Sequence, residues 1–302
     1  MVYLDSSSNT VVKYPHQAEE EPAIEVERQI YERFRQHGGH EGLLKYYGTF
    51  GPGIRLEYAS ENGLRHYIQT HEINPKQRLQ WAQQITSALA FVHSMNVIHA
   101  DLTCGNISLD DRLHARLLDF SGSSLDGSEP FVVVTASHKY PGDDLKSIRA
   151  DLFALGSTLY EILTGKPPYY ELALKEMEIT DLFKQAKFPD TKSLGPMGVI
   201  VTGCWQGRFV SADDVLKGVP FANIPQPLCT NALSSHQFLC QNKPTRSSDP
   251  RDDHRSFSAW LTRIPCLQIN EAITKWEDMA LTYLKELTSR ADISQASWNC
   301  QK

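Results

Sequence analysis

Apolar and polar residues alternate at two spacings along the chain, and the change between them predicts where strands give way to helices. Short apolar segments at Val2–Leu4 and Thr10–Lys13 predict two strands joined by a turn. Helical spacing over Ile24–Gln36 predicts a helix. Leu43–Phe50 and Ile54–Tyr58 predict a hairpin with a Gly-Pro-Gly tip. The chain is therefore expected to begin with a small antiparallel sheet and one helix.

The middle of the chain has mostly helical spacing. Asn74 followed by Pro75 is typical of a helix N-cap and first helical position, and an apolar stripe continues to Val92. The segment Asp151–Thr164 is mostly apolar, which predicts a helix buried in the core and ended by Gly165. Further strands are expected at Val97–Ile98, Ile107–Leu109 and Arg116–Leu118, and further helices at Val199–Trp205 and Ala212–Leu216.

The pattern changes after about Lys217. Residues 217–256 are rich in Pro, Ser, Asn and Gln and have little periodicity, which indicates a loop or disorder. Helical spacing returns over Ile269–Leu287 and predicts a C-terminal amphipathic helix. We therefore predict one domain over residues 1–217, followed at 218–302 by an irregular Pro/Ser-rich linker and that helix.

Composition narrows the class of protein. The chain has 302 residues, 41% of them hydrophobic and 22% charged, as in an ordinary globular protein. A net charge of −6 argues against a nucleic-acid surface, and no apolar run reaches the length of a membrane span. No N-terminal signal peptide is recognisable. The cysteines form no C-x-x-C pair, which favours reduced thiols in a cytoplasmic protein, with the nucleus not excluded.

The most informative chemistry lies in the run H-A-D-L-T-C-G-N at His99–Asn106 and in the D-F pair at Asp119–Phe120. Phosphoryl transfer needs a base for the proton of the attacking hydroxyl and oxygen ligands for Mg²⁺ on the phosphates. Asp101 is the candidate base, and Asn106 and Asp119 are the candidate Mg²⁺ ligands. Each of them alone is more often a turn or strand-end residue. Their common placement between short strands favours a catalytic loop.

Together with the run D-L-F-A-L-G-S-T-L-Y-E-I-L-T-G-K-P-P-Y at Asp151–Tyr169, this loop resembles the eukaryotic protein kinase family over residues 1 to about 217. The resemblance implies an α+β, two-lobed fold. Its N-lobe (1–58) would be a small, incomplete antiparallel sheet, and its C-lobe (59–217) would be mainly helical. It also implies ATP with Mg²⁺ and a Ser/Thr hydroxyl of a protein substrate.

The resemblance implies further site residues. Lys13 ends a strand similar to the V-A-I-K strand of the family, where the lysine holds the α- and β-phosphates and pairs with a helix carboxylate. Glu27 is the preferred partner and Glu25 the alternative. The run L-E-Y-A at Leu56–Ala59 resembles the hinge between the lobes, and there Leu56, Glu57 and Ala59 would line the adenine pocket.

Other positions would support the site. Tyr31, Tyr46, His99 and Phe120 match residues that stack as a hydrophobic spine in the family. The carboxylate of Asp151 would accept hydrogen bonds from the catalytic-loop backbone, since a buried carboxylate needs such partners. Arg208 would pair with an acid near the activation segment, either Asp143 or Asp144.

Several positions depart from the family pattern. No G-x-G-x-x-G precedes Lys13, and the match begins at the second strand of the family, as in a fragment or an incomplete gene model. Ala100 replaces the arginine that binds a phosphorylated activation loop, and Thr103 replaces a lysine that neutralises the γ-phosphate. Ser121 replaces the first glycine after Asp-Phe, where Gly122 would restore backbone freedom.

Three functions fit these residues. The first is a Ser/Thr-type protein kinase with weak activity, because the base and both metal ligands are present. The second is a pseudokinase scaffold that acts through protein contacts, which the missing Gly-rich loop and Thr103 favour. The third is a small-molecule phosphotransferase of related fold, against which Phe120 and the apolar helix argue. We place the active kinase first. The substrate, the pathway and the oligomeric state leave no trace in the sequence.

Overall fold

The computed structural model describes residues 1–172 and 175–220 of the chain. The chain divides into two units, Met1–Leu228 and Cys229–Lys302, and the description below concerns the first of them. The predicted linker and C-terminal helix lie outside the described residues, apart from residues 218–220. The predicted domain boundary at residue 217 stays a prediction.

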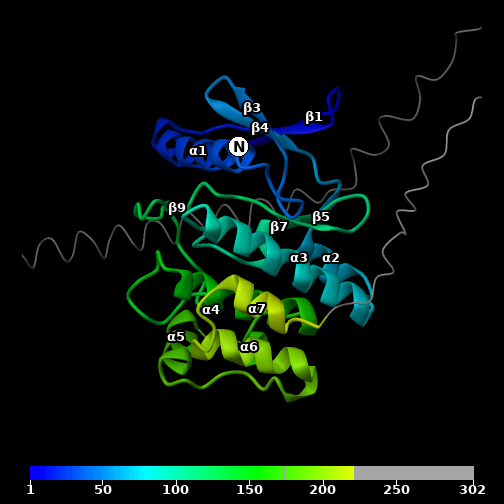
Figure 1. Ribbon diagram of the computed structural model, residues 1–302, viewed down its shortest axis with the longest axis vertical. Helices are drawn as coiled ribbons and strands as arrows, with labels where there is room; N and C mark the ends of the chain where they lie inside the picture. The colour runs from blue at the N-terminus through cyan, green and yellow to red at the C-terminus, as the bar shows by residue number, and fades with distance from the viewer. Residues whose placement is uncertain (173–174, 221–302) are drawn as a thin grey trace, which may run out of the picture. The chain divides into compact units, whose positions relative to one another are not determined.

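The N-lobe is a four-stranded antiparallel sheet with the strand order β1-β2-β4-β3. Its strands are β1 (Val2–Asp5), β2 (Thr10–Lys13), β3 (Tyr46–Phe50) and β4 (Gly53–Glu57). Helix α1 (Glu21–Gln36) lies against this sheet (Figure 1). The helix begins three residues before the prediction because Pro22 fits its first turn, where no backbone N–H is needed.

Helices dominate the rest of the described chain, as predicted, and they lie below the sheet in Figure 1. The predicted helices are α3 (Pro75–Ser94), α4 (Ile148–Thr164), α6 (Pro196–Gln206) and α7 (Ala212–Gly218). Asn74 caps α3 by accepting a hydrogen bond from the backbone N–H of Gln77 at 2.9 Å. Gly165 ends α4 in the left-handed conformation at φ 89°. The α+β fold predicted from the sequence is confirmed.

Two further helices were not predicted, namely α2 (Leu64–Thr70) and α5 (Glu176–Lys184). Both are short, and each buries only one or two side chains, so neither has the long apolar stripe from which α3 was predicted. None of the helices among residues 1–172 and 175–220 is long and apolar enough to span a membrane.

Short strands hold the loop that carries the candidate base. β5 (Glu61–Gly63), β7 (Ile107–Leu109) and β8 (Ala115–Leu117) form one small sheet, and β6 (Val97–Ile98) pairs with β9 (Ser124–Leu125). The loop between β6 and β7 contains Asp101 and ends in a short helical turn, η2 (Cys104–Asn106). The β7–β8 hairpin then brings Asp119 back beside this loop.

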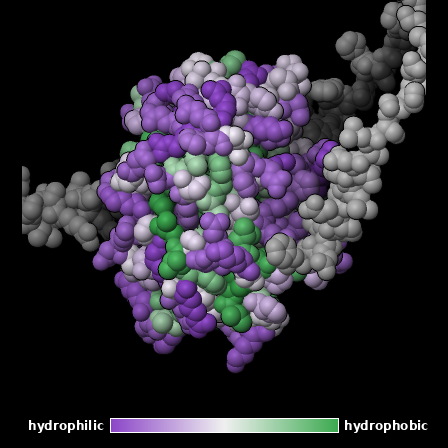
Figure 2. Space-filling model, viewed as in Figure 1, coloured by the Kyte–Doolittle hydropathy of each residue, from purple (hydrophilic) through white to green (hydrophobic). Residues whose placement is uncertain are grey.

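Helix α4 forms the centre of the helical core. It packs against α3 and, more extensively, against α6. The indole N–H of Trp205 on α6 donates a hydrogen bond to the hydroxyl of Ser157 at 3.0 Å. The surface seen in Figure 2 is largely hydrophilic, with hydrophobic residues gathered mainly in its helical half.

Gly156 lets α4 and α6 approach closely, and its replacement tests this packing. A Cβ at position 156 would lie 2.8 Å from Cβ of Cys204. We expect Gly156→Ala to lower the free energy of unfolding by about 1–3 kcal/mol, because the helices must move apart. Chemical denaturation measures this change. Gly218→Ala is the control, because its Cβ would lie 3.5 Å from the nearest atom. Equal stability of both variants would contradict the packing.

Candidate active site

A cavity of about 250 Å³ lies between the sheet and the small strands below it. Its lining includes predicted cleft residues, namely Lys13, Glu27, Leu56, Glu57, Ala59 and Asp119. Ser108 on β7 and Leu118 also line it, and no sequence pattern predicted either of them. A larger cavity of about 430 Å³ lies between α1 and β3, but it contains none of the predicted catalytic residues.

Lys13 connects the sheet, the helix and the loop after β8. Its ammonium nitrogen lies 2.7 Å from a carboxylate oxygen of Glu27 and 2.7 Å from Oδ1 of Asp119. Oε1 of Glu27 accepts a hydrogen bond from the backbone N–H of Phe120 at 3.0 Å. The alternative partner, Glu25, pairs with Arg28 instead. Of the two candidates, the structure therefore places Glu27 beside Lys13.

The charges of these groups depend on one another. Burial raises the pKa of Glu27, which is fully buried, against the opposing effect of Lys13. Burial acts to lower the pKa of Lys13, but the charges of Glu27 and Asp119 outweigh it and raise that pKa. Burial also acts to raise the pKa of Asp119, but the charge and hydrogen bond of Lys13, with a hydrogen bond from Ser121, lower it to about 2. Asp119 is therefore ionised at neutral pH.

The loop around Asp101 is held by Asp151 on α4, as the sequence predicts. The Asp151 carboxylate is buried and accepts hydrogen bonds from the backbone N–H groups of His99 at 2.8 Å and Ala100 at 2.9 Å. Its Oδ2 also lies 2.9 Å from the His93 ring. Ala100 has a left-handed backbone at φ 65°, which is strained for a residue with a Cβ. The bonds to Asp151 hold it there.

Asn106 contacts the candidate base directly. Its amide nitrogen donates hydrogen bonds to the backbone carbonyl of Asp101 and to its carboxylate, both at 2.8 Å. Burial raises the pKa of Asp101, although His99 and Asn106 oppose the change. A base works best when its pKa lies near the operating pH, so a raised pKa of Asp101 suits proton transfer.

The spine predicted from the sequence is assembled. The rings of Tyr31 and Tyr46 stack with centroids 5.9 Å apart, and Tyr31 meets Phe120 edge-on at 5.4 Å. The ring of His99 lies 5.0 Å from that of Phe120. This contact series runs from the sheet through α1 to the catalytic loop, so it fixes the two sides of the cleft relative to each other.

Two expectations are corrected. Gly122 does not use the conformational freedom of glycine, because its φ is not positive, whereas Asp119 has a φ of 66°. A Cβ at Gly122 would instead lie 2.9 Å from Cβ of Val132, so that glycine is needed for close packing.

The predicted ion pair of Arg208 is not formed. Arg208 is exposed and has no ion pair among the described residues. Arg149 occupies the neighbouring space and donates hydrogen bonds to the carbonyl of Cys204 at 2.6 Å and to that of Trp205.

The residues fit a magnesium ion bound with phosphates. Asp119 is ionised, its side chain is 39% exposed, and Asn106 uses its amide nitrogen for Asp101, which leaves its oxygen for a cation. Mg²⁺ prefers such oxygen ligands and takes the remainder from phosphates and water. Within residues 1–172 and 175–220, no group of three His, Cys, Asp or Glu side chains is arranged to hold a metal ion without such help.

A family model described as the protein kinase domain matches residues 7–212 of the chain. The chain belongs to the protein kinase family. It is 30% identical over 172 residues to the serine/threonine-protein kinase Sgk1 of Xenopus tropicalis, which is 52% of this chain and 40% of that kinase. It is 32% identical over 135 residues to Sgk1 of Homo sapiens, which is 40% of this chain and 30% of the human protein. The matches thus span less than half the length of these relatives.

The ion pair between Lys13 and Glu27 can be tested through its effect on stability. We expect Lys13→Met to lower the free energy of unfolding by about 3–5 kcal/mol, because it leaves the buried Glu27 carboxylate without its cation. The double variant Lys13→Met/Glu27→Gln removes that charge and should recover most of the loss. Urea denaturation measures both. A single variant as stable as the double one would show that Glu27 does not depend on Lys13.

Proposed function

We propose that this kinase domain transfers the γ-phosphate of ATP to Ser or Thr hydroxyls of a protein substrate. One observation carries the proposal, namely the convergence of Lys13, Glu27 and Asp119 beside a loop in which Asn106 holds Asp101. Lys13 would bind the α- and β-phosphates, and Glu27 would orient its ammonium group. The cytoplasm, with its ATP and its reducing conditions, is the proposed location.

The proposed chemistry is one proton transfer and one phosphoryl transfer. The substrate hydroxyl oxygen attacks the γ-phosphorus, its proton passes to the Asp101 carboxylate, and the bond to ADP breaks. The oxygens of Asn106 and Asp119 would hold Mg²⁺, which when bound neutralises charge on the phosphates. Asp151 keeps Asp101 in place through the backbone of His99 and Ala100.

The adenine ring would lie in the cavity under β4. Leu56, Glu57 and Ala59 line that cavity, and the backbone of Glu57 and Ala59 would bond the adenine edge. Ser108 adds a hydroxyl to the lining.

A second candidate is a pseudokinase that binds partners without transferring phosphate, and Thr103 favours it. The Thr103 hydroxyl accepts a hydrogen bond from the backbone N–H of Gly105 at 3.1 Å, and the residue is buried. It therefore serves as a cap of the catalytic-loop turn and supplies no positive charge to a phosphate.

The deciding experiment uses the full chain with Mg-ATP and a serine-containing substrate protein. We expect slow phosphate incorporation that falls by about 10²-fold or more in Asp101→Asn, because the base is lost. Asp119→Ala should abolish both incorporation and the rise in melting temperature that Mg-ATP produces. Asp126→Asn is the control, since Asp126 pairs with Arg33 on the surface, and it should keep the wild-type rate.

The outcomes separate the two candidates. Incorporation by the wild type no greater than that of Asp119→Ala would rule out transfer. A melting temperature raised by Mg-ATP without transfer would favour a nucleotide-binding pseudokinase. No rise at all would favour a scaffold that works without nucleotide.

A further inference from the structure

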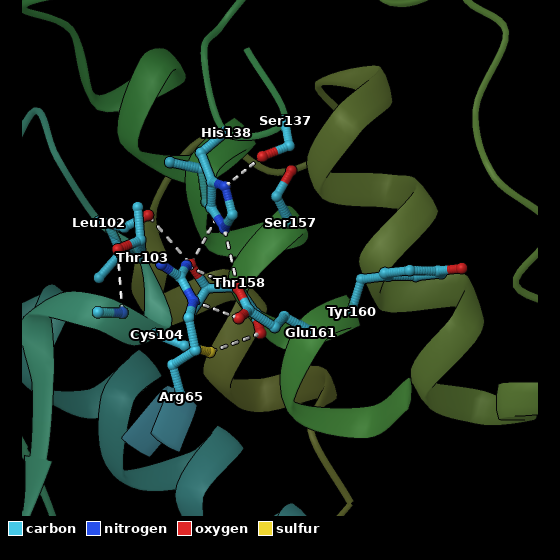
Figure 3. A network of polar contacts seen from close by, with 12 residues as sticks. Arg65, Leu102, Thr103, Cys104, Ser137, His138, Ser157, Thr158, Tyr160 and Glu161 are labelled. Carbon is cyan, nitrogen blue, oxygen red and sulfur yellow. Dashed lines mark hydrogen bonds and ion pairs between the residues drawn. The ribbon is translucent and has the colours of Figure 1, made fainter. Parts of the chain in front are cut away.

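A second charged network lies beside the catalytic loop, and neither the sequence pattern nor the proposed chemistry uses it (Figure 3). Arg65 on α2 donates two hydrogen bonds to Glu161 on α4, from Nε at 2.6 Å and from Nη2 at 3.1 Å. The ring of His138, from the segment before α4, lies 3.6 Å from the same carboxylate. Three separate parts of the chain therefore meet at Glu161.

Glu161 is not available to another cation. Its side chain is only 2% exposed, and both of its oxygens are bound by Arg65. Burial, with a smaller effect of Arg65, lowers the pKa of His138 to about 3, so this ring is neutral at physiological pH. The Arg65 side chain, in contrast, is 39% exposed. The group that this network offers to a substrate is therefore a guanidinium.

Arg65 also lies against the catalytic loop. A Cβ on Gly105 would be 3.3 Å from Nη1 of Arg65, so the absence of a side chain at Gly105 makes room for the guanidinium. Among the residues whose side chains the structure describes, Nη1 has no hydrogen-bond partner. Gly105 directly precedes Asn106, whose amide holds the Asp101 carboxylate. Burial raises the pKa of Asp101, and Arg65 is among the charges that oppose this rise, so the two side chains lie close enough to interact. A substrate hydroxyl placed at Asp101 thus has Arg65 within a few residues of extended chain, each of which spans about 3.3–3.6 Å.

We infer that Arg65 makes this domain select acceptor peptides with an acidic side chain near the phosphorylated hydroxyl. The inference rests on the proposed function, because Asp101 fixes where the hydroxyl lies. A substrate carboxylate can accept hydrogen bonds from the Nη1 side of the guanidinium, while Nε and Nη2 stay with Glu161. A substrate lysine would be repelled by Arg65 and could not pair with Glu161, because Arg65 binds both oxygens of that carboxylate. Arg65 therefore attracts acidic peptides and repels basic ones.

The test uses the full chain and two synthetic peptides. Both contain one serine among neutral residues, and the serine is flanked by aspartates in one and by lysines in the other. We expect kcat/KM of the wild type to favour the aspartate peptide by about tenfold, which corresponds to about 1.4 kcal/mol. The double variant Arg65→Gln/Glu161→Gln removes both charges without stranding a buried carboxylate, and it should bring the ratio close to one.

A second pair of an arginine with a carboxylate, in which the carboxylate is more exposed than Glu161, provides the control. Arg33 and Asp126 form a surface pair whose Nη2 and Oδ2 atoms lie 2.6 Å apart. Arg33→Gln/Asp126→Asn should keep the tenfold ratio. If the Arg65 variant fails to fold, the salt dependence of the wild type takes its place, because an exposed contact between unlike charges weakens as ionic strength rises.

Binding separates this inference from the proposed function. The same peptides with alanine for serine, carrying a fluorescent label, report affinity by anisotropy without any transfer. If the wild type binds the aspartate peptide more tightly than the lysine peptide, and the double variant does not, the inference is supported even if no phosphate is transferred. The inference would be overturned if the wild type bound both peptides equally, bound the lysine peptide more tightly, or bound neither. It would also be overturned if the preference for the aspartate peptide persisted in the double variant or at high salt.

Discussion

The contact of one ammonium group with two carboxylates determines the arrangement of the cleft. Lys13 comes from β2, Glu27 from α1 and Asp119 from the loop after β8, and the three lie within ion-pair distance. Glu27 is fully buried, so its carboxylate needs both the charge of Lys13 and the N–H of Phe120. A shift of α1 or of the Asp119 loop would leave a buried charge without a partner. The ion pair therefore fixes sheet, helix and loop in the arrangement that the proposed phosphoryl transfer would use.

Patterns of local origin could be predicted from the residues themselves, whereas the contacts of Lys13 with Glu27 and of Asp151 with its loop were predicted only through the resemblance to a family. Asn74 as a cap, Gly165 as a helix end and the apolar α4 depend on neighbouring residues, and the structure has them where the sequence places them. Short elements with few buried residues, such as α2, leave weak periodicity and were missed. Contacts between distant segments need knowledge of the fold. That is why the ion pair of Arg65 and Glu161 could not be read from spacing.

The departures from the family pattern act on different steps. Ala100 keeps the strained backbone of the loop, held by Asp151, but has no side chain to bind a phosphate on the activation segment. Thr103 caps the turn that contains Gly105 and leaves that part of the loop without its own positive charge. The guanidinium of Arg65 lies against this turn. Positioning of Asp101 is thus retained, while charge compensation differs from the family pattern, in agreement with the slow phosphoryl transfer and the acidic-peptide preference that we propose.

We propose that Asn106 and Asp119 bind a divalent cation together with ATP in the cleft of Lys13. Calorimetric titration of the full chain with ATP, with and without Mg²⁺, measures this binding. We expect ATP to bind in the presence of Mg²⁺ and omission of the metal to weaken binding by at least about tenfold, since the triphosphate charge is then less compensated. Equal affinity with and without Mg²⁺, or no binding in either case, would contradict it.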